Sequence, residues 1–106
     1  MATLDDFKKL DFRVAEILEV NPHPDADRLY VVKVRIGEAE KQLVAGIREH
    51  YSPEDLKGKK VVIIDNLDPV VLRGVESQGM LLVAKDATGL CILTLDKTLA
   101  SGARIS

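Results

Sequence analysis

The alternation of side chains from Tyr30 to Ile36 constrains the fold more than any other feature of the chain. Every second residue of this segment is a large apolar one: Tyr30, Val32, Val34 and Ile36. Lys33 and Arg35 fall between them. Because successive side chains of a β-strand point to opposite faces, the pattern predicts a strand with one buried and one accessible face. Other strands must then cover the apolar face.

Further apolar or β-branched runs, separated by turn residues, predict these other strands. They cover residues 12–20, 42–45 and 61–64, and a hairpin of 80–85 with 90–95. Two short helices are also expected. Thr3 and Asp6 have the spacing of a capping box for a helix over residues 4–10, and Ser52 with Pro53 begins a second helix that Gly58 ends.

Short strands at close spacing with one helix inserted midway are typical of a small β-barrel. About five strands in this order match an oligonucleotide-binding (OB) barrel. We therefore predict an all-β fold, a five-stranded OB barrel with short helices and a C-terminal extension. Residues 1–106 are expected to form a single domain.

Composition and charge narrow the class of protein. Apolar residues make up 46% and charged residues of both signs 30%, which favours a folded chain over disorder. No apolar run approaches the roughly 20 residues of a membrane span, and no secretory signal is visible. We expect Cys91, in an apolar run, to be a buried thiol in a cytoplasmic protein. The formal net charge is −2, so a nucleic-acid binder would need a local basic patch.

Two places could supply such a patch. Lys33 and Arg35 project to the outer face of the second predicted strand, where OB barrels bind nucleic acid. They can contact phosphates or be ordinary solvated charges. Lys57, Lys59 and Lys60 follow the second helix, whose negative end favours them without any ligand.

The segment 65–84 joins a charged loop, DNLDPVVLR, to a glycine-rich turn and an apolar strand, GVESQGMLLVA. Glycine lets a ligand approach the backbone closely. Arg73 stands directly before this turn, Ser77 offers a hydroxyl, and Met80 either packs in the core or contacts a bound base. No catalytic motif accompanies these residues, so the segment indicates a binding surface.

Catalytic and metal chemistry find little support in the sequence. The surroundings of Ser77 do not match a nucleophile elbow, and no phosphate loop or dinucleotide fingerprint is present. His23, Asp25 and Asp27 share one loop, but aspartates in proline-rich loops usually bond their own backbone. We expect no cofactor, no metal and no catalysis by this chain alone.

Five motifs in one order carry a family resemblance. They are LDFRVAEI (10–17), HPDADRLYVVKV (23–34), LVAGI (43–47), YSPEDLKGKKVVII (51–64) and NL-P with G-x-x-S-x-G-M (66–80). Over about residues 7–105 the chain resembles the tRNA-binding domain found at the C-terminus of many methionyl-tRNA synthetases and as free-standing tRNA-binding proteins.

The resemblance implies an OB barrel, a homodimer and recognition of tRNA by shape rather than sequence. It also implies an accessory domain that works with the catalytic part of a methionyl-tRNA synthetase. The contact residues it implies are Lys33, Arg35, Asn66, Arg73, Ser77 and Met80. Asn66 and Ser77 would bond phosphates or 2′-hydroxyls, Arg73 would pair with a phosphate, and Met80 would pack on a base.

Two other functions stay open. A bacterial export-chaperone family shares the barrel and its dimer, although the complete HPDAD loop and S-x-G-M favour tRNA binding. The second is a domain that serves only to dimerise. Such a domain would not bind tRNA at any salt concentration.

Overall fold

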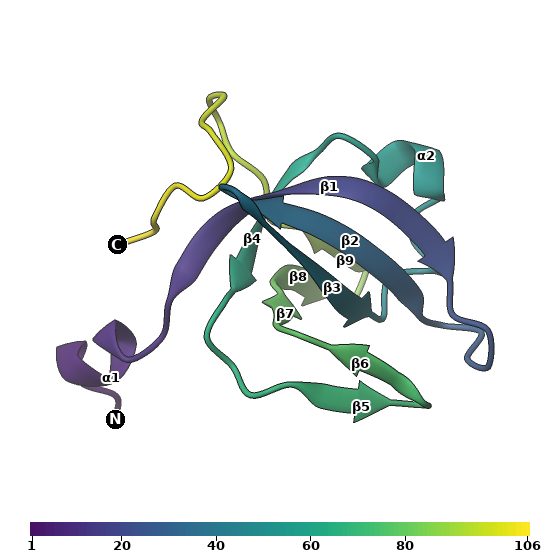
Figure 1. The fold of residues 1–106 in the computed structure, drawn as a ribbon, viewed down its shortest axis with the longest axis horizontal. Helices are drawn as coiled ribbons and strands as arrows, with labels where there is room; N and C mark the ends of the chain where they lie inside the picture. The colour runs from purple at the N-terminus through teal and green to yellow at the C-terminus, as the bar shows by residue number, and fades with distance from the viewer.

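The computed structural model describes residues 1–106 and contains nine strands and two short helices (Figure 1). The elements are α1 (Leu4–Lys8), β1 (Phe12–Pro22), β2 (Tyr30–Ile36), β3 (Ala39–Ala45), α2 (Pro53–Leu56), β4 (Lys60–Ile64), β5 (Val70–Leu72), β6 (Val75–Ser77), β7 (Met80–Leu81), β8 (Val83–Asp86) and β9 (Gly89–Ile92). Neither helix is long and apolar enough to cross a membrane.

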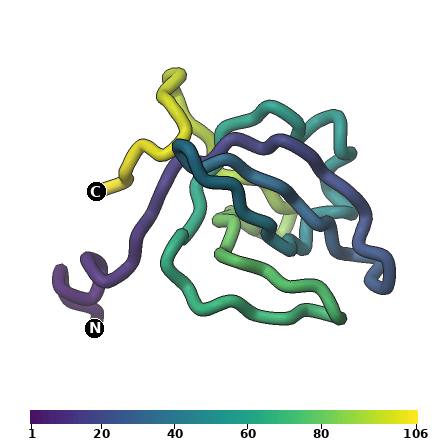
Figure 2. Tube along the Cα trace, in the orientation of Figure 1, coloured from purple at the N-terminus to yellow at the C-terminus, as the bar shows by residue number.

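Five strands form one antiparallel sheet in the order β3-β2-β1-β4-β7, and it curls into a half-barrel (Figures 1 and 2). A bulge between Ile17 and Glu19 shifts the β1–β2 register, and such bulges increase strand twist. Gln78 bridges the open side. Its amide donates to the Gln42 carbonyl at 2.8 Å, and its side-chain oxygen accepts from the Gln42 amide at 2.9 Å. The predicted OB-type fold is confirmed.

The concave side of the sheet holds an aliphatic core. All four alternating residues of β2 are buried, as the sequence predicts, and Lys33 and Arg35 are exposed. Ile17, Leu43, Leu56 and Ile63 are among the largest fully buried side chains of this core. Helix α2 contributes Leu56, so it closes one end of the half-barrel.

The helix starts are confirmed. The predicted capping box at Thr3–Asp6 is present, and Ser52 caps α2 before Pro53 as predicted, with an additional capping box formed by Asp55. The predicted hairpin 80–85/90–95 has the observed register, in which Lys85 pairs with Leu90, but its strands are shorter than predicted. Residues 80–81 pair with β4 in the main sheet, and only β8 and β9 form the hairpin. Cys91 is exposed, contrary to the prediction, because it lies between the inward side chains of Leu90 and Ile92 on β9.

The segment 65–73 was expected to be a loop, but residues 70–77 form the hairpin β5–β6. Its turn places Arg73 at φ 52° and Gly74 at φ 87°. Positive φ at both central residues is the geometry that matches the twist of a two-residue hairpin. Arginine rarely adopts this conformation, so the turn leaves a weak signal in the sequence.

Gly79→Ala should destabilise the fold by about 1–3 kcal/mol, because a new Cβ would lie 2.8 Å from the Ile64 carbonyl oxygen and 3.1 Å from Leu43 Cδ2. Gly46→Ala is the matched control, since its Cβ would meet only Leu29 Cδ2 at 3.8 Å. Thermal unfolding should show a loss of several degrees for Gly79→Ala alone. Equal melting temperatures for the two variants would contradict this packing.

Candidate nucleic-acid interface

Two loops at one end of the half-barrel lie against each other. The β1–β2 loop (residues 23–29) contacts the β5–β6 hairpin (residues 70–77) through His23 Nε2 and the Leu72 carbonyl oxygen, 3.0 Å apart. Figure 1 shows the hairpin tip reaching toward this loop on the right. In OB barrels the loop between the first two strands and the loop between the last two frame the nucleic-acid site. We call residues 23–29 and 70–77 the loop–hairpin surface.

Arg73 stands at the tip of the hairpin, with its side chain exposed. One guanidinium nitrogen, Nη2, donates to the Asp25 carbonyl oxygen at 3.1 Å. A left-handed backbone costs a non-glycine residue about 1–2 kcal/mol, so surrounding contacts must hold it. The remaining guanidinium hydrogens make no hydrogen bond to protein, and they can pair with a phosphate.

Two further arginines lie beside the same loop, and the sequence reasoning did not select them. The Arg48 amide donates to the Arg28 carbonyl at 3.4 Å, so the two are neighbours. Arg48 Nη1 also donates to the Ala26 carbonyl at 3.3 Å. Arg28 pairs with Glu49 at 3.1 Å, but both side chains are exposed and such pairs are weak. Residues 28 and 48 lie just outside the paired strands β2 and β3, so they become neighbours only through the folded sheet, and no sequence pattern points to them.

Lys33 and Arg35 lie on the sheet and not on the two loops. Lys33 Nζ is 3.8 Å from Glu19 Oε2, and Arg35 stands opposite Glu16 on β1 and Glu40 on β3. This face is therefore balanced in charge. Its cations can adjoin an RNA site, but they create no strong positive field by themselves.

Asn66 lies at the other end of the segment that carries the hairpin. Its side-chain oxygen accepts from the Asp11 amide at 2.8 Å, and its side-chain nitrogen donates to the Lys9 carbonyl at 2.7 Å. Both groups thus tie the residues after α1 to the barrel. The structure does not bring Asn66 together with Arg73 through any hydrogen bond.

Ser77 is buried, with 5% of its surface exposed. Its hydroxyl accepts from the Val44 amide at 2.9 Å and donates to the Gly79 carbonyl at 3.0 Å. It therefore joins β6 to β3 beside the Gln78 bridge and completes the closure of the half-barrel.

Ser77→Ala should leave the Val44 amide without its acceptor and cost about 1–3 kcal/mol of folding free energy. The affinity of the folded fraction for tRNA should stay within about twofold of wild type. Calorimetry and a binding titration check the two effects. A large loss of affinity at an unchanged melting temperature would instead make Ser77 a direct contact.

Met80 is half exposed and borders an apolar groove of about 330 Å³ between the hairpin and the sheet. The apolar side chains around it include Val44, Leu67, Val70, Leu72 and Val83. Val70 and Leu72 are themselves exposed on β5. The apolar face of a nucleic-acid base could pack against these side chains.

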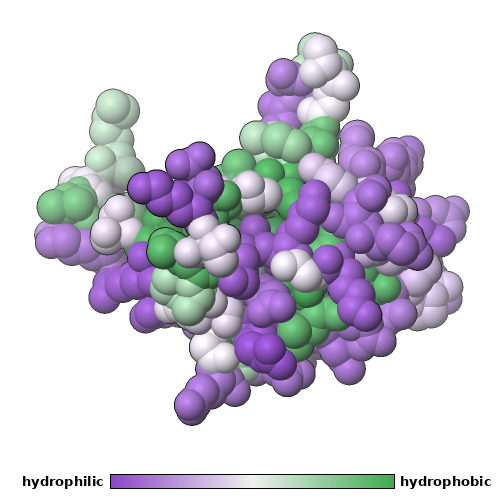
Figure 3. Space-filling model, turned by 90° about the horizontal axis from the view of Figure 1, so that it is seen from above, coloured by the Kyte–Doolittle hydropathy of each residue, from purple (hydrophilic) through white to green (hydrophobic).

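The opposite side of the molecule carries the second basic cluster. Helix α2 and the C-terminal segment lie at the top of Figure 1, away from the β5–β6 hairpin. Lys59, Lys60 and Lys97 line a shallow hollow there, and Lys60 Nζ donates to the Leu99 carbonyl at 2.8 Å. Figure 3 looks onto the molecule from above, and most of the side seen there is hydrophilic.

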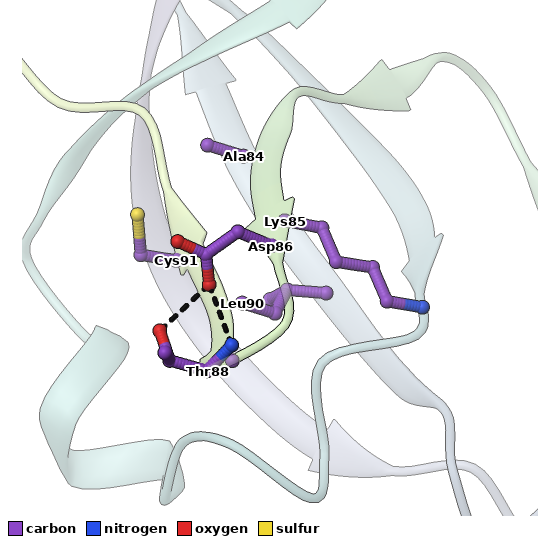
Figure 4. A pocket seen from close by; sticks show the side chains of 7 residues that line it. Ala84, Lys85, Asp86, Thr88, Leu90 and Cys91 are labelled. Atoms are coloured by element: carbon purple, nitrogen blue, oxygen red, sulfur yellow. Dashed lines mark hydrogen bonds between the residues drawn. The ribbon is translucent and has the colours of Figure 1, made fainter.

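A third hollow, on the β8–β9 hairpin, shows Asp86, Thr88 and Cys91 (Figure 4). The Thr88 hydroxyl and amide both donate to Asp86 Oδ1, at 2.6 and 2.8 Å. These bonds, the hydroxyl's first, lower the pKa of Asp86 by stabilising its charged form. They shape the turn of the hairpin. No three His, Cys, Asp or Glu side chains gather to hold a metal anywhere in the chain.

Comparison with known proteins agrees with the geometry. A family model described as "Putative tRNA binding domain" matches residues 12–104. A methionine–tRNA ligase of Thermococcus kodakarensis is 58% identical over 103 residues, which are 97% of this chain and 14% of the ligase. The chain thus spans about a seventh of that relative's length.

Two solved structures share the fold. The MetRS related protein from Pyrococcus horikoshii has a TM-score of 0.92 and 31% identity, over 100% of this chain and 98% of that one. Chaperone CsaA from Bacillus anthracis has a TM-score of 0.89 and 30% identity, over 100% and 99%. The chaperone likeness supports the alternative function only as a related fold.

The family model covers nearly the whole chain, and the matching region of a methionine–tRNA ligase is more than half identical. The prediction from the five motifs is therefore confirmed, and the chain belongs to the tRNA-binding domain family that methionyl-tRNA synthetases contain.

Proposed function

We propose that this domain binds tRNA on the loop–hairpin surface, through phosphates and shape and not through base sequence. The observation that carries the proposal is the clustering of Arg28, Arg48 and Arg73 around the β1–β2 loop in a chain whose net charge is −2. Phosphate contacts position an RNA without reading its sequence.

The other predicted residues take different parts in this proposal. Met80 and the apolar groove receive an unstacked base of a tRNA loop, since proteins bind such bases on apolar side chains. Lys33 and Arg35 lie on the adjoining sheet and extend the contact. Asn66 and Ser77 act as supports, because their polar groups are already engaged within the protein.

A titration of total tRNA against the same mass of duplex DNA, at increasing salt, tests the proposal. Three phosphate contacts predict that the logarithm of the tRNA association constant falls with the logarithm of salt concentration at a slope of roughly −2 to −3. Duplex DNA should bind more weakly, because its shape differs. Absence of tRNA binding at low salt would contradict the proposal. Equal affinities for tRNA and duplex DNA would show that the protein attracts any polyanion and does not recognise the shape of tRNA.

The domain is proposed to act in the cytoplasm as an accessory to the catalytic part of a methionyl-tRNA synthetase. This rests on the match to a small share of such a ligase. A weak tRNA contact becomes useful there, because a tethered second site raises the effective concentration of the tRNA. The domain alone should support no aminoacylation.

We further propose a homodimer. None of the residues of α1 is buried, and Leu4, Phe7 and Leu10 are exposed around it. The rings of Phe7 and Phe12 stack with centroids 5.4 Å apart. Helix α1 projects from the barrel at the left of Figures 1 and 3, and an apolar segment of this kind requires a cover. A twofold partner is the most frequent arrangement.

The apolar groove beside β5 also suits an extended peptide, which favours the chaperone-like alternative. Salt separates the two functions. Peptide binding in an apolar groove should persist at about 1 M salt, whereas phosphate contacts are lost there.

A further inference from the structure

His23 is the one buried histidine, with 2% of its surface exposed, and it joins the two halves of the loop–hairpin surface. Its Nε2 lies 3.0 Å from the Leu72 carbonyl oxygen, and its Nδ1 lies 3.0 Å from the Asp25 amide nitrogen. A carbonyl can only accept a hydrogen bond, so Nε2 carries the hydrogen. An amide N–H can only donate, so Nδ1 is the acceptor. Together the two partners specify the neutral Nε2–H tautomer.

The bond to Leu72 reaches the last residue of β5, directly before Arg73. The hairpin pairs only three residues of each strand, and a two-stranded hairpin has little stability of its own. Its other ties are at the far end of β6, where Gln42 Nε2 donates to the Glu76 carbonyl and Ser77 bonds Val44. At the tip, the only hydrogen-bonding partners of the hairpin outside its own strands are His23 and Asp25.

We propose that His23 is a positioning residue for tRNA binding: its neutral imidazole clips the tip of the β5–β6 hairpin to the β1–β2 loop and thereby presents Arg73 to the RNA phosphate. The inference rests on the proposed function. His23 is buried and does not contact the RNA itself.

No charged neighbour can replace the bond between His23 and Leu72. Arg28 pairs with Glu49, and Arg48 donates to the Ala26 carbonyl. Arg73 reaches the β1–β2 loop only through its solvent-exposed bond to the Asp25 carbonyl. Without the His23 bond, Arg73 keeps that exposed bond alone, and exposed contacts contribute little to order.

Two substitutions separate the two bonds of the imidazole. His23→Gln keeps an N–H donor at the ε position for the Leu72 carbonyl and removes the Nδ1 acceptor. His23→Asn keeps an acceptor at the δ position for the Asp25 amide and cannot reach Leu72. We expect His23→Asn to weaken tRNA binding about tenfold and to lower the salt slope by about one unit, matching Arg73→Ala. His23→Gln should retain most of the affinity.

A double-mutant cycle tests positioning against general destabilisation. If His23 acts through Arg73, adding His23→Asn to Arg73→Ala should change tRNA affinity less than twofold. The proposal would be overturned if the fold-losses of tRNA affinity in the two single variants multiplied in the double variant. Equal losses of affinity in His23→Asn and His23→Gln would also overturn it. Thermal unfolding defines the temperature at which every variant stays folded.

Amide exchange without RNA separates this inference from the proposed function. In His23→Asn the amides of the hairpin should exchange at least tenfold faster than in wild type, while those of β1 and β2 keep their protection. Unchanged hairpin exchange would overturn the clip. If the exchange result holds but wild type binds no tRNA at any salt, the clip stands as a structural device and the proposed function falls, together with the role of His23 in RNA binding.

Discussion

Arg73→Ala is expected to weaken tRNA binding about tenfold at roughly 0.1 M salt, the loss that one phosphate contact implies. Arg73 is exposed and is the only cation between Pro69 and Gly74. The salt slope should decrease by about one unit, and the loss should be equal for all tRNA species, because phosphates carry no sequence information. A fluorescence titration over a range of salt concentrations gives both quantities.

Lys97→Ala is the matched control, since Lys97 is an exposed cation on the opposite side of the barrel. Its tRNA affinity should stay within about twofold of wild type. Neither variant should lose stability, because exposed charges rarely contribute much to folding. Equal weakening by the two substitutions would mean that attraction is diffuse and that the loop–hairpin surface is not the site.

Phe7→Asp is expected to convert the protein from a dimer to a monomer. Phe7 is exposed on α1 and stacks on Phe12. A central aromatic residue in an interface contributes about 2 kcal/mol or more, and a twofold dimer contains two copies of it. About 4 kcal/mol corresponds to a roughly thousandfold weaker dimer. Sedimentation at micromolar concentration measures the masses.

Ala87→Asp controls for the added charge, because Ala87 is exposed in the turn between β8 and β9. This variant should remain a dimer. A wild-type chain that sediments as a monomer at high micromolar concentration would contradict the homodimer directly, and a dimeric Phe7→Asp would place the interface elsewhere.

The main sheet and the helix starts could be predicted because their signals are local. Alternation along Tyr30–Ile36 reflects one buried face of a strand, and the caps at Thr3 and Ser52 depend on residues at most three positions apart. The β5–β6 hairpin could not be predicted, because Val70–Leu72 are exposed apolar residues without alternation and the turn places an arginine at positive φ. Cys91 shows that an apolar run does not by itself define which face is buried.

The candidate site depends on contacts between distant parts of the chain, which a sequence pattern does not reveal. Arg28 and Arg48 are 20 positions apart and become neighbours only through the β2–β3 pairing. From the sequence, His23 is only a loop residue with weak support as a metal ligand. Its structural role becomes visible only through its contact with the Leu72 carbonyl. Ser77 and Asn66 read as free polar groups until their partners, the Val44 and Asp11 amides, are seen.

Hydrogen–deuterium exchange of the protein with and without saturating tRNA tests the central claim most directly. The loop–hairpin surface predicts the strongest protection in residues 23–29 and 70–77, with smaller changes on β2 around Lys33 and Arg35. The basic cluster of Lys57, Lys59, Lys60 and Lys97 lies on the opposite side and should exchange at the same rate in both samples. Protection confined to that cluster, with the two loops unchanged, would contradict the account.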